Sequence, residues 1–177
     1  MNSDFNYHTQ IITVRHPFKR LVSAYLDKLL HKSSGYYNNV ASYIEKNNHY
    51  KRINVNDRYT PLTGEPTFED YINFIVDTSS NKNYKGDTHW SDYQKLCDPC
   101  RHKYDLVLKL ETIEEDLEYL RDRLKIPDDA EGIMTVSQNK HEYDFMTYFN
   151  ELPQPLFEQV YDMYKEDFEM FGYEKPS

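Results

Sequence analysis

The sequence has few of the features that mark membrane-spanning, secreted or disulfide-rich proteins. No apolar run approaches the roughly 18 residues that cross a bilayer. Residues 1–6 are polar and lack the basic start and apolar middle of a signal peptide. Two cysteines among 177 residues are too few for a disulfide framework. Tyr and Phe, in contrast, number 17 and 9, and such aromatics can fill the core of one domain.

Basic charge is scarce overall but concentrated near the start of the chain. The net charge of −9 argues against a nucleic-acid partner. Residues 1–60 carry nine Lys and Arg against four Asp and Glu, whereas residues 61–177 carry twelve against twenty-six. This basic first third predicts a local anion site, and the alternative is a chance cluster on a solvated surface.

The hydrophobic pattern predicts strands alternating with helices. A β-branched strand at 10–14 is followed by Pro17 at a helix start and by apolar residues at helical spacing to about residue 31. The alternation favours an α/β fold with a parallel sheet. Further along, we expect a loop over 33–65 with one helix near 37–47, and a helix from Thr67 with Asp70 in its first turn. A loop over 77–88, a strand over 104–110 and a helix from Thr112 to about Leu124 should follow, and a capping box over 112–115 opens that helix. Pro153 and Pro155 precede a last helix with an apolar stripe of Phe157, Val160, Tyr161, Tyr164 and Phe168.

Arg15 directly follows the first predicted strand and precedes a helix start. Ligands of α/β sheets bind beyond the carboxyl ends of strands, and a helix N-terminus attracts anions. The Arg15 guanidinium offers a planar fork of donors for phosphate oxygens. Ser23 lies off the apolar stripe, with Lys19 one turn before it. The residues thus suggest an anion site, against the alternative of a strand-capping Arg and an ordinary helical Ser.

The stretch from Val14 to Tyr25 reads Val-Arg-His-Pro-Phe-Lys-Arg-Leu-Val-Ser-Ala-Tyr. It resembles the 3′-phosphate-binding motif of the Golgi carbohydrate sulfotransferases, the group of the chondroitin and dermatan 4-sulfotransferases and the HNK-1 sulfotransferase. In that family the Arg and the Ser hold the 3′-phosphate of 3′-phosphoadenosine-5′-phosphosulfate (PAPS). The resemblance therefore implies Arg15 and Ser23, with Lys19 beside them, as cofactor-binding residues. Many members carry an acidic residue where His16 stands.

Other stretches resemble the chondroitin 4-sulfotransferases in the same order, over roughly residues 9–175, although 33–65 and 125–150 match poorly. They are His89-Trp90, Leu96–Cys100, Tyr104–Val107, Glu111-Thr112 and Tyr161–Tyr173. Several motifs in order are more specific than one.

The resemblance implies a P-loop-nucleotide-kinase-like sulfotransferase fold and transfer of a sulfonate from PAPS to a glycan hydroxyl, without a metal. The implied acceptor is glycosaminoglycan-like, with N-acetylgalactosamine of chondroitin or dermatan favoured. The implied location is the lumenal side of the Golgi membrane, with an anchor in the full-length form. Basic side chains would attract the anionic glycan: Lys19, Arg20, Lys28, Lys51, Arg52 and Arg58.

One element of the family is absent from these 177 residues. The family binds the 5′-phosphosulfate with a Pro-Lys-x-Gly-x-Thr/Ser loop, and no such loop precedes Arg15 here. We therefore expect residues 1–177 to be the C-terminal part of a single sulfotransferase domain, incomplete at the N-terminus, poorly soluble and inactive alone. A different segment replacing the loop is the alternative. The competing functional class is an inactive or binding-only fragment that recognises the 3′-phosphoadenosine nucleotide or a sulfated glycan.

Two residues are candidates for catalysis. His89 could take the proton of the acceptor hydroxyl while Trp90 stacks on a sugar ring. The alternative is a loop His beside a core Trp. Glu111, after the second strand, could be a base or could orient the site, or it could be an exposed residue ahead of a helix cap.

Cys97 and Cys100 form a Cys-x-x-Cys pair, with His89 and His102 nearby. Zinc binding, and with it a zinc-dependent interaction module, is a weak alternative because His102 follows too closely for a finger pattern. A redox pair is weaker, since no strand runs into the motif. The lumenal setting that the resemblance implies favours a disulfide, either between the two or with cysteines of the missing upstream part.

Overall fold

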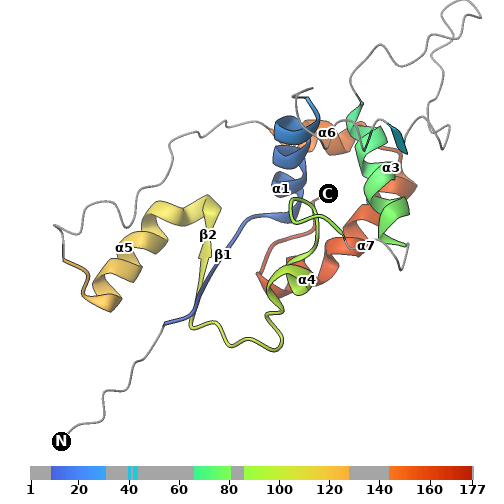
Figure 1. Cartoon of the computed structure of the whole chain (residues 1–177). Helices are drawn as coiled ribbons and strands as arrows, with labels where there is room; N and C mark the ends of the chain where they lie inside the picture. The colour runs from blue at the N-terminus through green and yellow to red at the C-terminus, as the bar shows by residue number, and fades with distance from the viewer. Residues whose placement is uncertain are drawn as a thin grey trace, which may run out of the picture. The chain divides into compact units, whose positions relative to one another are not determined.

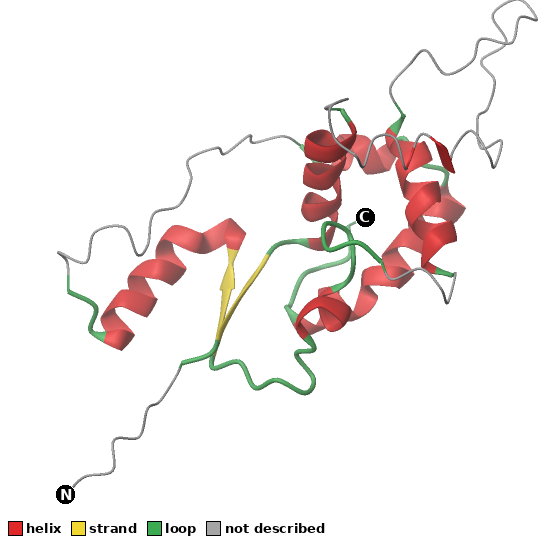
Figure 2. Ribbon diagram, in the orientation of Figure 1, coloured by secondary structure: helices red, strands yellow, loops and turns green. Residues whose placement is uncertain are grey.

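The structure is a computed structural model that describes residues 9–30, 40, 42–43, 66–80, 86–127 and 144–176. Most of the predicted loop at 33–65 and its helix near 37–47 lie outside the described residues. Figure 1 colours the chain from the N- to the C-terminus, and Figure 2 colours it by secondary structure. The elements in chain order are β1 (Ile11–Val14), α1 (Pro17–Ala24), the π-helical turn η1 (Tyr25–Leu29), α3 (Phe68–Ser79), α4 (Tyr93–Cys97), β2 (Leu106–Lys109), the 3₁₀ turn η2 (Leu110–Thr112), α5 (Ile113–Leu124), α6 (Met146–Asn150) and α7 (Gln154–Met170).

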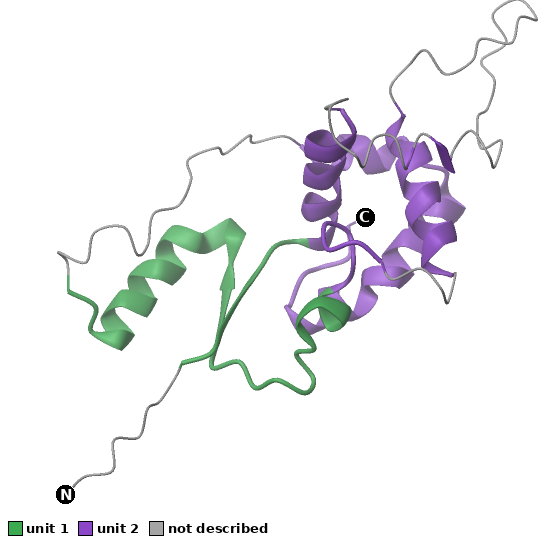
Figure 3. Cartoon of the chain, viewed as in Figure 1, with its two compact units in different colours: residues 1–16, 93–143 green, residues 17–92, 144–177 purple. Residues whose placement is uncertain are grey.

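The chain divides into two compact units (Figure 3). Unit 1 comprises Met1–His16 and Tyr93–Tyr143, and unit 2 comprises Pro17–Asp92 and Asp144–Ser177. Each unit is described by itself below. None of the helices in the described ranges is both long and apolar enough to cross a membrane.

Unit 1 contains a parallel pair of strands. β1 pairs with β2 in the register that places Ile11 opposite Leu106 and Val14 opposite Lys109. The parallel pairing confirms the mixed α/β prediction, with two strands among the described residues. Helix α5 closes a small aliphatic core on the strands, and its buried members are Leu108, Ile113 and Leu120.

The start of α5 differs from the prediction. No capping box forms at Thr112, whose side chain makes no cap bond and whose backbone is not extended, because the 3₁₀ turn η2 already curls the chain there. The Asp116 carboxylate makes the hydrogen bonds at the start of the helix instead. Its Oδ2 accepts from the Lys109 backbone N–H at 2.6 Å and from Thr112 Oγ1 at 3.1 Å. A residue one turn into the helix thus ties the helix to the end of β2.

Unit 2 is built around stacked aromatic rings from helices. The Phe18 ring of α1 stacks on Phe149 of α6, with centroids 3.9 Å apart, and meets Phe157 and Phe168 of α7 edge-on. The predicted apolar stripe of the last helix is confirmed, since Phe157, Val160, Tyr164 and Phe168 are buried and Tyr161 is half-buried. Such ring pairs stabilise a core beyond the area that they bury.

Helix α3 begins as predicted and ends later. Thr67 Oγ1 accepts from the Asp70 N–H at 3.1 Å and Asp70 Oδ2 accepts from the Thr67 N–H at 2.9 Å, which completes a capping box. The helix continues to Ser79, past the start of the predicted loop at 77. The hydroxyls of Thr78 and Ser79 bond back to helix carbonyls at 2.6 and 2.7 Å, so these polar residues satisfy themselves on the helix.

Two short helices, α4 and α6, were not predicted; each has only five residues, too few for a hydrophobic period to be read. The predicted long helix from residue 17 widens into η1 after Ala24. There the Tyr25 hydroxyl donates to the Pro66 carbonyl at 2.8 Å in a buried contact, which joins the end of this segment to the start of α3.

Candidate functional site

In unit 1 the carboxyl ends of the two strands are joined by side chains. The Arg15 backbone N–H donates to the Tyr93 hydroxyl at 3.0 Å. The next backbone N–H, of His16, donates to Glu111 Oε1 at 3.0 Å. Both donors that follow β1 are therefore satisfied by side chains from α4 and η2, which fixes the backbone at Arg15.

Arg15 stands where the sequence predicts, directly after β1, and is half-buried. Glu111 is exposed, and its contact with the His16 N–H is the contact of a residue that orients the backbone. A proton-accepting role for Glu111 stays a prediction. His16 and Glu111 lie 95 positions apart in sequence and meet because β1 and β2 are paired in parallel.

In unit 2 the other two residues of the anion motif share one face of α1. Lys19 and Ser23 are four residues apart, one helical turn, and both are half-buried. The buried face of the helix is formed instead by Pro17, Phe18, Leu21, Val22 and Ala24. The Lys19 ammonium lies 5.6 Å from the centre of the Phe145 ring. A cation and a hydroxyl on one polar face of a helix are donors that suit a phosphate.

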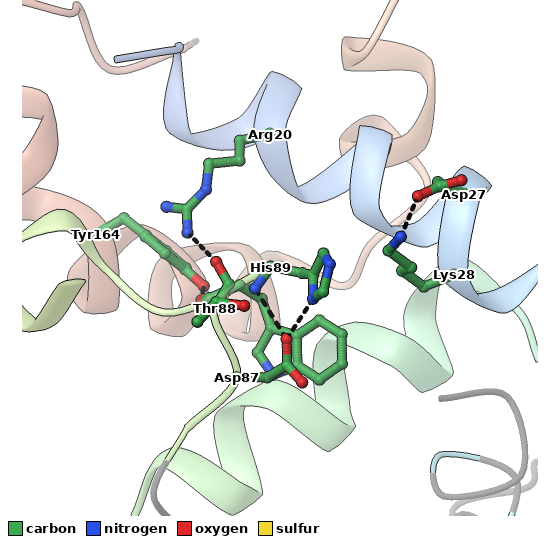
Figure 4. Close-up of polar contacts among 8 residues, drawn as sticks. Arg20, Asp27, Lys28, Asp87, Thr88, His89 and Tyr164 are labelled. Atoms are coloured by element: carbon green, nitrogen blue, oxygen red, sulfur yellow. Dashed lines mark hydrogen bonds and ion pairs between the residues drawn. The ribbon is translucent and has the colours of Figure 1, made fainter. Parts of the chain in front are cut away.

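His89 lies in a tight turn between α3 and α4 (Figure 4). Its ring Nδ1 is 2.6 Å from Asp87 Oδ1, and its backbone N–H donates to the same oxygen at 2.8 Å. The ring is about a third exposed. A histidine that is both partly exposed and held by a carboxylate can accept a proton from a bound hydroxyl.

Trp90 does not have the predicted sugar-stacking role. Its side chain is only 5% exposed and meets the rings of Tyr71 and Phe74 edge-on. The indole packs into the aromatic core of unit 2, so no sugar ring can stack on it. The alternative of a loop His beside a core Trp therefore describes Trp90 correctly.

The predicted glycan-attracting basic residues have mixed environments. Arg20 Nη2 donates to the Thr88 carbonyl at 2.9 Å, which connects α1 to the turn that holds His89 (Figure 4). Lys28 pairs with its neighbour Asp27 at 2.6 Å. Arg20 and Lys28 thus have protein partners, and Lys19 lies near the Phe145 ring. The other three predicted residues lie outside the described residues: Lys51, Arg52 and Arg58.

Cys97 and Cys100 are free thiols in the structure, half-buried and exposed respectively. The disulfide between these two that the resemblance favours is therefore not formed here; pairing with cysteines elsewhere stays a prediction. Throughout the described ranges, no three His, Cys, Asp or Glu side chains are grouped as metal ligands.

Two residues near the candidates, Asp87 and Tyr93, were missed from the sequence, and Arg20 was predicted only as a basic side chain that attracts the glycan, without its contact to Thr88. The sequence pattern Gly86-Asp87-x-His89 could have indicated Asp87. An Asp side chain often accepts a hydrogen bond from the backbone N–H two residues later. No such pattern indicates the contacts of Tyr93 and Arg20, since their partners lie 78 and 68 positions away. The candidates fall into two groups, with Arg15 and Glu111 in unit 1 and Lys19, Ser23 and His89 in unit 2.

Comparison with known proteins identifies the family of the chain. The chain is 30% identical to rat (Rattus norvegicus) carbohydrate sulfotransferase 11 over 184 residues, 31% identical to human (Homo sapiens) carbohydrate sulfotransferase 9 over 178, and 28% identical to Xenopus laevis carbohydrate sulfotransferase 12 over 183. These matches cover 100%, 97% and 96% of the chain but 50%, 39% and 41% of the relatives. The chain thus spans half or less of the length of these relatives.

No solved structure matches the chain significantly. The family model described as "Sulfotransferase family" matches residues 1–174, and this family implies a P-loop fold for the α/β arrangement seen here. Because that match covers nearly the whole sequence, the chain belongs to the sulfotransferase family.

Proposed function

We propose that this chain supplies the 3′-phosphate-binding part of a PAPS-dependent carbohydrate sulfotransferase. The observation that carries the proposal is the continuous segment in which Arg15 directly follows β1 and Lys19 and Ser23 share the polar face of α1. Family membership makes PAPS the expected donor, and all three side chains are donors that suit a phosphate.

Each residue of this segment has a distinct role in the proposal. The Arg15 guanidinium offers two parallel N–H donors to phosphate oxygens. The Ser23 hydroxyl donates one further hydrogen bond, and the Lys19 ammonium adds a positive charge one turn earlier. PAPS supplies the sulfonate, while these residues only position its nucleotide end.

The proposed acceptor is a hydroxyl group of a glycan. The matched relatives are named as carbohydrate sulfotransferases of different numbers, at similar identity of 28–31%. N-acetylgalactosamine of chondroitin or dermatan is the favoured acceptor because the motifs around His89 and Tyr161 resemble the chondroitin 4-sulfotransferases. We propose action in the Golgi lumen on the same grounds, by a longer, membrane-anchored form.

His89 is the proposed base, because its ring is partly exposed and held by Asp87. Glu111 is proposed to orient the backbone at His16. No metal takes part in this scheme.

A binding-only role is the second candidate. It is favoured by one feature of the sequence: these 177 residues contain no Pro-Lys-x-Gly-x-Thr/Ser loop. In that case the chain would bind the 3′-phosphorylated nucleotide without turnover.

Calorimetry tests the nucleotide assignment. Adenosine 3′,5′-bisphosphate should bind more tightly than adenosine 5′-monophosphate, and Arg15→Ala should weaken the former by about 1.5–3 kcal/mol through loss of charge-assisted hydrogen bonds. Arg101→Ala is the matched control, because that side chain is 84% exposed and pairs only locally with Asp98. Equal binding of both nucleotides would reject the assignment.

Radiolabelled sulfonate transfer from PAPS to desulfated chondroitin or dermatan separates the two candidates. The 177-residue polypeptide alone should transfer no detectable sulfonate, because one lost electrostatic donor already costs on the order of 10²–10³ in rate. A polypeptide that also carries a family-type 5′-phosphosulfate loop upstream should be active. Robust transfer by the 177 residues alone would show that the catalytic groups all lie within them.

A further inference from the structure

The turn that carries His89 places a carboxylate oxygen against one nitrogen of the imidazole ring. Asp87 Oδ1 lies 2.6 Å from His89 Nδ1, and an ionised carboxylate can only accept hydrogen bonds. Nδ1 must therefore carry the hydrogen in this contact. In the neutral ring, the lone pair that can accept a proton is then on Nε2, the ring nitrogen that does not contact Asp87 in this hydrogen bond.

The turn is built to hold this pair in place. Gly86 has a φ of +72°, and a Cβ there would lie 2.6 Å from Ser91 Oγ, so a larger residue would be strained. The Asp87 carbonyl accepts from the N–H groups of Trp90 and Ser91 at 3.1 and 2.7 Å. Three backbone N–H groups, those of residues 89, 90 and 91, thus point at one residue, Asp87.

Two longer-range contacts anchor the turn to the core of unit 2. The buried Tyr164 hydroxyl of α7 donates to the Trp90 carbonyl, and Arg20 of α1 donates to the Thr88 carbonyl. His89 therefore lies between two anchored residues. A side chain on such a support loses little freedom when a substrate binds.

We propose that Asp87 is a positioning residue that holds His89 in the Nδ1–H tautomer, so that Nε2 takes the proton of the acceptor hydroxyl. This inference rests on the proposed function. In the step, the hydroxyl O–H bond breaks and its proton moves to Nε2. The oxygen forms the new bond to sulfur as the bond from sulfur to the departing phosphate oxygen breaks. The Asp87 charge then stabilises the imidazolium, the arrangement known from Ser-His-Asp triads.

The tautomer can be measured without any activity. In a ¹⁵N-labelled 177-residue chain, two-bond ¹H–¹⁵N correlation spectra at a pH where the rings are neutral distinguish protonated from unprotonated ring nitrogens. A His89→Gln spectrum identifies the His89 signals among the seven histidines. We expect Nδ1 to be protonated in the wild type. An Nε2–H tautomer there would overturn the inference and leave the nucleotide-binding proposal intact.

The matched pair of variants is Asp87→Asn and Asp162→Asn. An Asn amide can donate to Nδ1 and so permit the other tautomer, whereas Asp162 lies exposed on α7. Only Asp87→Asn should change the His89 spectrum. An unchanged tautomer in a folded Asp87→Asn chain would contradict the positioning role, and the wild-type spectrum decides the question if that variant does not fold.

Kinetics in a sulfonate-transferring form of the protein complete the test. Asp87→Asn should lower kcat on the order of 10²–10⁴-fold, in the range of general-base and triad variants, with little change in acceptor KM. A shifted tautomer with unchanged kcat would refute the positioning role. Full activity of His89→Ala would instead refute the proposed base, which is a failure of the proposed function.

Discussion

The two units differ in how their cores are made. Unit 2 is held by buried aromatic rings in direct contact, such as Phe18 on Phe149. Unit 1 has a small aliphatic core behind two four-residue strands and leaves large apolar side chains exposed: Val107, Leu110, Tyr119 and Leu124. Aromatic rings thus form most of the packing described in unit 2, whereas unit 1 combines a small aliphatic core with polar contacts at its strand ends.

This contrast also separates the candidate residues. In unit 2, Lys19, Ser23 and His89 are carried by a helix and a turn that pack on the aromatic core. In unit 1, Arg15 and Glu111 depend on hydrogen bonds to Tyr93 and His16. Stability and site geometry should therefore respond to different substitutions in the two units.

The largest expected effect is that of Phe18→Ala in unit 2. This side chain is fully buried and contacts three other rings, so its removal should cost about 3–5 kcal/mol of unfolding free energy. Leu108→Ala in unit 1 should cost about 2 kcal/mol, at the low end for a buried Leu, because its small core can relax. Denaturant titration measures both.

The control for this comparison is Tyr119→Ala, whose side chain is 54% exposed and should change stability by less than about 0.5 kcal/mol. A smaller loss for Phe18→Ala than for Leu108→Ala would reverse the contrast between the units.

Asp116→Ala should have the next largest effect, within unit 1. The substitution leaves the part-buried Lys109 N–H without its 2.6 Å acceptor and removes the bond to Thr112, at a cost of about 1–3 kcal/mol. The control is Asp122→Ala, because the Asp122 side chain on the same helix is exposed. Equal effects of the two substitutions would mean that Asp116 does not hold α5 to β2.

Thr67→Ala should cost about 1 kcal/mol in unit 2, because it removes the side-chain half of the α3 capping box. Thr67→Ser should retain most of that stability, since its hydroxyl can accept from the Asp70 N–H. Thermal unfolding of the two variants side by side measures the difference. Equal losses would point to the methyl group rather than to the cap.

The smallest effect concerns alkaline pH. Burial, together with the 2.8 Å hydrogen bond to Asp77, raises the pKa of Tyr43 to about 12 from its ordinary 10.0. The folded chain keeps this proton where the unfolded chain loses it, so stability should fall as the pH rises from about 10 through about 12. Urea titrations across that window should show a shallower fall for Tyr43→Phe than for the wild type. Identical slopes would exclude the coupling.

Local patterns were the most predictable part of the fold. The strand, turn and helix from Ile11 to Ala24, the α3 cap at Thr67 and the buried stripe of α7 follow from residues within a few positions of one another. The family also followed from the ordered motifs, beginning with Arg15 and Ser23. The prediction of a capping box at Thr112 was wrong. The preceding residues of the same chain form a 3₁₀ turn there, and this turn precludes the capping box.

The sequence by itself determined which residue types follow β1 and which faces of the helices are apolar, because propensity, capping and periodicity act over about one turn. Only the tertiary structure decided that Trp90 fills the core and that Glu111 meets the His16 backbone. Only it joined the His89 turn to α1 through Arg20. Such contacts join residues tens of positions apart, and they depend on strand pairing and helix packing that no local pattern encodes.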